Sequence, residues 1–173
     1  LKGYISRSVS SGAMTATRAF GPAFGSDQWL LLGEIGGTFI HDMPDKDDLR
    51  LEGAGTYTGG NPVLAGPEGL EGRKGFADRF SWGYRLTARF DFLNAIGPIN
   101  LFPRVSFQHD VNGTTPSPLA TYLEGRKAVS FGLGATYQQN WSADIQYTNF
   151  FGGGRYNLIN DRDFVSINVK YSF

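Results

Sequence analysis

The sequence predicts an all-β protein: an antiparallel, up-and-down transmembrane β-barrel, of which this chain supplies about seven strands. Three observations lead to this fold class: the composition, a two-residue hydrophobic period, and an alternation of short and long connections. The chain has 173 residues with 24 glycines, 14% aromatic residues and only 18% charged residues. An average chain has about 7% glycine and about 25% charged residues. Many aromatic residues with few charges favour strands over helices.

The last segment shows the two-residue period most clearly. Val165, Ile167, Val169 and Tyr171 occupy every second position before Phe173, and polar residues lie between them. Because successive side chains of a strand point to opposite faces, this pattern predicts one apolar and one polar face. The same alternation recurs in the segments 29–39, 80–92, 99–107, 129–137 and 141–151. Segment 4–20 is strand-like, with poorly separated faces, and completes seven predicted strands.

The connections between these segments alternate in length. Tight turns rich in Gly, Pro and Asn are predicted at 21–26, at 95–98 and around Asn140, whereas 44–79, 111–125 and 152–161 are long and polar. Bacterial outer-membrane barrels have short periplasmic turns and long outer loops. Trp and Tyr also gather toward the strand ends on the apolar face, as interfacial girdles do. The sequence therefore predicts the bacterial outer membrane as location and its lipid as partner, with a soluble barrel as the alternative.

Composition also narrows the functions. Sixteen basic and sixteen acidic residues give no net charge, so no nucleic-acid partner is expected. The absence of cysteine excludes thiolate metal sites and cysteine nucleophiles. We expect no enzyme activity and no cofactor, because each histidine of the pairs 41–42 and 109–110 points away from its neighbouring aspartate. The acidic run 42–48 could bind calcium, but its spacing favours a solvated loop, so no metal site is predicted.

The end of the chain resembles the terminal strand of outer-membrane barrels. The matching residues are Val165, Ile167, Val169, Tyr171 and Phe173, an alternating apolar series that closes on an aromatic residue. In that class, this signature is read by the barrel-assembly machinery. The resemblance therefore implies that these five residues form an assembly signal and that the machinery is a partner.

Longer stretches resemble the C-terminal region of the DUF1302 family. They are YRLTAR at 84–89, SFQHDVNG at 106–113, YLEGRKA at 122–128, YTNFFGG at 147–153 and DRDFVS at 161–166. The resemblance implies a proteobacterial outer-membrane protein that handles hydrophobic compounds, with a periplasmic or lipoprotein partner. Members are longer, which implies that residues 1–173 are the C-terminal portion of one barrel domain without its N-terminal strands. The count of seven agrees, because bacterial single-chain barrels have even strand numbers.

The polar face carries the candidate functional residues. We expect seven of them to line a lumen: Glu34, Arg85, Arg89, Asp91, Arg104, Asp144 and Lys170. The alternative is a ladder of paired charges that braces the wall. Three of these residues are arginines on neighbouring strands and would form a basic patch that the carboxylates neutralise in part. Unpaired arginines would favour anionic solutes.

Two functions fit these features of the sequence. The first is a channel or transporter for small or hydrophobic solutes, and the alternative is a structural or assembly-partner barrel with an occluded lumen. A repeated motif, LEGRK at 70–74 and again at 123–127, places basic residues before two of the strands. These basic residues could contact lipopolysaccharide phosphates, and a duplicated hairpin explains the repeat equally well.

Overall fold

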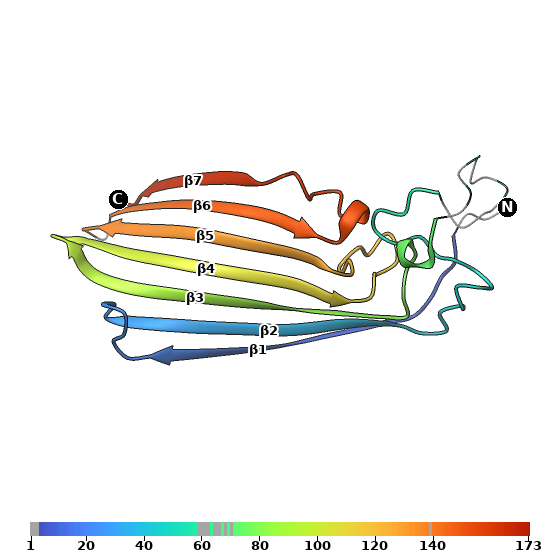
Figure 1. Cartoon of the computed structure of the whole chain (residues 1–173). Helices are drawn as coiled ribbons and strands as arrows, with labels where there is room; N and C mark the ends of the chain where they lie inside the picture. The colour runs from blue at the N-terminus through green and yellow to red at the C-terminus, as the bar shows by residue number, and fades with distance from the viewer. Residues whose placement is uncertain (1–3, 59–62, 64–66, 68, 70, 139) are drawn as a thin grey trace.

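A computed structural model describes residues 4–58, 63, 67, 69, 71–138 and 140–173. Seven strands form one sheet in chain order, each antiparallel to the next (Figure 1). The strands are β1 (Val9–Phe20), β2 (Gln28–Ile40), β3 (Phe80–Ile96), β4 (Ile99–Asn112), β5 (Arg126–Tyr137), β6 (Trp141–Gly152) and β7 (Phe164–Tyr171). Two short 3-10 helices, η1 (Arg73–Gly75) and η2 (Gly154–Tyr156), lie in the connections. The predicted all-β, up-and-down arrangement is confirmed, and the sheet is open between β1 and β7.

The connections alternate as predicted. Short turns join β1 to β2, β3 to β4 and β5 to β6, and long connections join the other strands. The tightest turn holds only Gly97 and Pro98 between β3 and β4, with Gly97 at a φ of +57°, which favours glycine. All the long connections lie at one end of the sheet (Figure 1). No helix in the described part of the chain is long and apolar enough to cross a membrane.

The register gives the sheet two chemically different faces. One row across the strands joins Val105, Phe131, Tyr147 and Val165 as direct partners. The opposite face carries rows such as Glu34, Arg85 and Gln108. We call these the apolar face and the polar face. Because cross-strand partners point the same way, the alternation predicted for single segments becomes a property of the whole sheet.

Large side chains on the apolar face are exposed to an unusual degree. Phe131, Ile145 and Ile167 have exposed fractions of 56%, 45% and 72%. No described segment packs over this face. Soluble monomers rarely expose contiguous apolar patches of more than a few hundred Å², so a surface extending over several strands indicates an apolar environment or a partner.

The buried core lies in the long connections instead of the sheet. Met43 and Ala77 are at most 5% exposed and cluster with Ile40 at the end of β2. Phe76 and Leu123 of the long connections are also buried. We call the connections 41–58, 71–79, 113–125 and 153–163 together the loop cap, because they gather beyond the same end of the strands (Figure 1). The predicted long polar loops therefore contain a folded, partly apolar unit.

A cationic side chain ties the first two parts of the loop cap together. The Lys46 ammonium donates to the carbonyl oxygens of Arg73 and Phe76, at 3.1 and 2.9 Å, and forms an ion pair with Asp78 at 2.7 Å. Asp78 also accepts a hydrogen bond from the amide of Thr114, at 2.9 Å. The β2–β3 connection is thereby fixed to the β4–β5 connection.

Candidate functional site

The polar face brings the seven candidate residues to one side of the sheet. Glu34 of β2 is directly opposite Arg85 of β3, and Arg89 of β3 is opposite Arg104 of β4. Lys170 of β7 is opposite Ser142 of β6. Asp91 and Asp144 lie on this same side, because each is two positions from a polar-face neighbour on its own strand.

The strongest contact on the polar face skips a strand. Both terminal nitrogens of the Arg104 guanidinium donate to Asp144, at 2.6 and 2.9 Å, and one also donates to Gln146 at 2.8 Å. Arg104 is on β4 and its partners are on β6, so the side chain lies across β5. It passes over Gly132, where an added Cβ would be only 2.6 Å from the guanidinium carbon. Because residue 132 is glycine, the Arg104 side chain can lie flat against the polar face of the sheet.

A second arginine is also paired. The Nε of Arg89 lies 2.8 Å from Asp91, and its guanidinium is 4.6 Å from the ring centre of Phe102. Two of the three arginines of the expected basic patch therefore have carboxylate partners within 3 Å. Arg85 differs: it faces Glu34 across the strands but forms none of the ion pairs found in the described residues.

A small polar hollow lies between these pairs. Its volume is about 290 Å³, and its walls include Arg89, Phe102, Arg104 and Asp144. Hydroxyl pairs continue the polar surface across the sheet toward the loop cap. They are Thr87 with Ser106 at 2.9 Å and Ser130 with Thr148 at 2.8 Å. The face can therefore contact water or a polar solute, while Arg89 and Arg104 already have carboxylate partners on the sheet.

Sequence reasoning missed the role of Asp110. This carboxylate is 1% exposed and accepts hydrogen bonds from Arg126 Nε at 2.7 Å and from the Leu123 amide at 3.1 Å. It fixes the end of the β4–β5 connection to β4. Asp110 precedes a long connection and Arg126 follows it, and this placement of opposite charges at the two ends of a loop is the signal that could have found the pair.

The histidines lie where the alternation predicts. His109 packs beside Tyr84 on the apolar face, with ring centres 5.7 Å apart, while Asp110 points to the polar side. His41 forms a 2.8 Å hydrogen bond with Ser10. Neither geometry joins a histidine to its neighbouring aspartate.

The acidic run 42–48 forms ion pairs with an arginine of the loop cap. Arg73 binds Asp47 at 2.8 Å and approaches Asp45 to 3.5 Å. The repeated basic motif also pairs with itself, since Lys74 of the first copy lies 3.2 Å from Glu124 of the second. Leu70, the first residue of that motif, lies outside the described residues.

The expected assembly signal is well exposed. Val165, Ile167 and Val169 are 58%, 72% and 63% exposed on β7, and Phe173 extends beyond the strand. Tyr171 packs between Trp141 and Phe173, with ring centres 4.7 and 5.1 Å away. The aromatic residues at the chain end therefore form a cluster beside the short turns.

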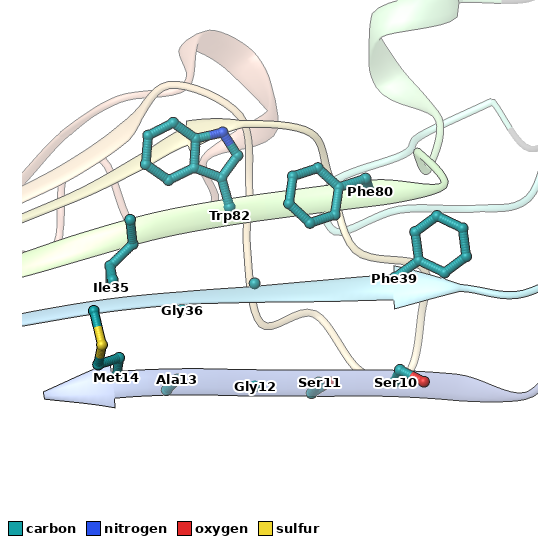
Figure 2. Close-up of a pocket in the computed structure, with 11 residues that line it drawn as sticks. Ser10, Ser11, Gly12, Ala13, Met14, Ile35, Gly36, Phe39, Phe80 and Trp82 are labelled. Carbon is teal, nitrogen blue, oxygen red and sulfur yellow. The ribbon is translucent and has the colours of Figure 1, made fainter.

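A shallow groove of about 770 Å³ crosses the apolar side of β1, β2 and β3 near the loop cap. Figure 2 shows its aromatic wall, Phe39, Phe80 and Trp82, and Met14 and Ile35 further along the strands. Glycines at its floor, Gly12, Gly36 and Gly37, leave the backbone uncovered. The groove is part of the exposed apolar face, and its lining contains no charged residue.

Comparison with known proteins assigns the chain to a family. The family described as "Protein of unknown function (DUF1302)" matches residues 1–173. The protein belongs to the DUF1302 family. No curated protein and no solved structure matches the chain significantly. The two-faced sheet and its loop cap are thus structural features of a DUF1302 protein. The description of this family names no activity.

The Arg104–Asp144 pair should stabilise this DUF1302 sheet. We expect Asp144→Ala to lower the free energy of unfolding by about 1–2 kcal/mol, since it removes hydrogen bonds to a charged, partly exposed group. Denaturant unfolding from detergent measures this loss. In a double-mutant cycle, Arg104→Ala should add little once Asp144 is absent, and fully additive losses would contradict a direct pair.

Proposed function

We propose that this protein forms part of the wall of an outer-membrane β-barrel that passes small or hydrophobic solutes. The observation that carries the proposal is the two-faced sheet, with exposed apolar side chains on one side and a polar, ion-paired surface on the other. That division fits a wall between lipid and a water-filled lumen. The gathering of all long connections at one end agrees with an outer surface, and the short turns agree with a periplasmic one.

One observation favours the alternative of an occluded, structural barrel. The loop cap is tightly packed, with Phe76 and Thr115 fully buried and Leu123 only 4% exposed. A packed cap could close the lumen instead of narrowing it. In that case the same wall would serve as a scaffold or assembly partner and would conduct nothing.

The proposed location brings partners with it. Lipid would cover the apolar face, and lipopolysaccharide would surround the end that carries the loop cap. The barrel-assembly machinery would read the exposed terminal strand, and a periplasmic or lipoprotein partner would meet the short turns. The aromatic cluster of Trp141, Tyr171 and Phe173 supports a membrane–water interface at the end of the sheet that carries the short turns, since aromatic residues gather at such interfaces.

Lipid exposure can be tested on β7. Ile167→Arg should destabilise the protein in bilayers by about 2–4 kcal/mol, because it would place a charge in hydrocarbon. The matched variant Asn168→Arg, on the polar side of the same strand, should cost far less. Folding titrations into liposomes measure both changes, and equal losses would exclude the assignment of faces.

Transport can be tested in a planar bilayer. The intact protein, purified from membranes, should give discrete conductance steps. Replacing Arg85 with Ser should shift ion selectivity toward cations, because this arginine lacks the close carboxylate of the other two. The matched variant Arg104→Ser removes a paired charge and should shift selectivity less. A folded protein without any conductance would support the occluded alternative.

Assembly can be tested at the chain end. Deleting Phe173 should reduce insertion into the outer membrane of cells more than it reduces folding in detergent, because only the cell uses the machinery. Heat-modifiable mobility on gels measures the folded fraction in both settings. Undiminished insertion in cells would remove the terminal residue from the proposed signal.

A further inference from the structure

One side chain of the loop cap reaches back over the polar face. Tyr122 belongs to the β4–β5 connection, yet its hydroxyl lies beside Gly36 of β2, so the side chain crosses above β3. A Cβ added to Gly36 would be 2.7 Å from that hydroxyl oxygen. Only a residue without a side chain leaves room for the phenol there.

At this level, β2 and β3 carry no side chains on the polar face. Gly36 is paired with Gly83 of β3, so two adjacent strands present no side chain to the polar side. Two positions further along each strand, Glu34 and Arg85 face each other. The phenol of Tyr122 therefore rests in a niche just above the charged row.

The backbone of Tyr122 is held firmly in place. It donates to Thr115 Oγ1 and accepts from the Thr115 amide, each at 2.9 Å, and the hydroxyl of Thr115 contacts Ser81 of β3 at 3.1 Å. The next residue, Leu123, donates to the buried Asp110. Burial raises the pKa of the Tyr122 phenol, and the charge of Asp110 adds to this, so the group is neutral at physiological pH.

We propose that Tyr122, seated in the niche at Gly36, is the residue that narrows the lumen and sets the size limit for solutes. This rests on the proposed channel. Thr115 and Asp110 hold the loop against the end of the sheet, and the phenol extends it across β3 to the level of Gly36 and Gly83, next to the row of Glu34 and Arg85. A neutral ring beside two charges then forms the narrowest passage, and solutes must fit between it and the opposite wall.

Planar-bilayer recordings with polyethylene glycols of graded mass test the size limit on the intact protein. Tyr122→Ala should raise single-channel conductance roughly twofold and admit larger polymers, because it removes the ring from the passage. Tyr122→Phe keeps the ring and should conduct like the native protein. Tyr137→Ala, on the apolar face far from the loop cap, is the control for losing a tyrosine and should change nothing.

Gly36→Ala tests the niche itself. The added methyl should displace the phenol and widen the passage in the native background, and it should have no further effect in the Tyr122→Ala protein. An equal effect of Gly36→Ala in both backgrounds would overturn the niche. Unchanged polymer exclusion in Tyr122→Ala would overturn the size limit.

Hydrogen exchange tests the seating of Tyr122 independently of whether the protein conducts. Amides of residues 113–125 should exchange about tenfold faster in Tyr122→Ala and Gly36→Ala, because their local opening becomes easier. Faster exchange in a protein that never conducts would mean that the channel fails and that Tyr122 only anchors the loop, which overturns the size limit. Native exchange rates in both variants would overturn the seating of Tyr122.

Discussion

The register of backbone pairing from β1 to β7 is the constraint on which the rest of the structure depends. Because strand side chains alternate, a slip of one residue would exchange the two faces of every strand beyond it. The described strands have two register shifts, both between β3 and β4. The shift near the loop cap is a bulge, where Trp82 pairs with Asn112 and Gly83 with Asp110. Val111 is the extra residue of the bulge. It lets Asn112 pair with Trp82 while Asp110, the partner of Gly83, still points to the polar side.

The register also explains why the sheet has no buried core. A single layer of strands cannot cover its own apolar face, and the buried apolar side chains of the described residues lie in the loop cap and at the end of β2, where Ile40 packs with Met43 and Ala77. Exposed residues such as Phe131 and Ile167 must then be stabilised by the surroundings. In the proposed barrel, lipid covers these side chains, so the sheet needs no second layer of protein over its apolar face.

The sequence was sufficient to predict the strands and the lengths of their connections, because both depend on local patterns. The period around Val165 and Ile167 marks a face, and the Gly97–Pro98 turn marks an end. The contacts of the site were not predictable in the same way. Arg104 reaches Asp144 over Gly132, and Tyr122 reaches Gly36 over β3, so each contact needs a glycine on one strand and a long side chain from a distant segment. A two-residue period contains no information about such pairs, nor about a loop that folds back on the sheet.

On the polar face, the sheet supplies the paired charges and the loop cap supplies the side chain that extends over them. Arg104 and Arg89 lie against the sheet with their carboxylate partners, so they add charge balance but little bulk to the space in front of them. In the proposed barrel, the loop cap would therefore set the width of that space, because Tyr122 is fixed there through Thr115 and Asp110. The same wall could therefore surround an open passage or a closed one. In the proposed barrel, conductance would depend on how far the loop cap reaches over the polar face, and Gly36 and Gly132 determine how closely side chains can approach the sheet.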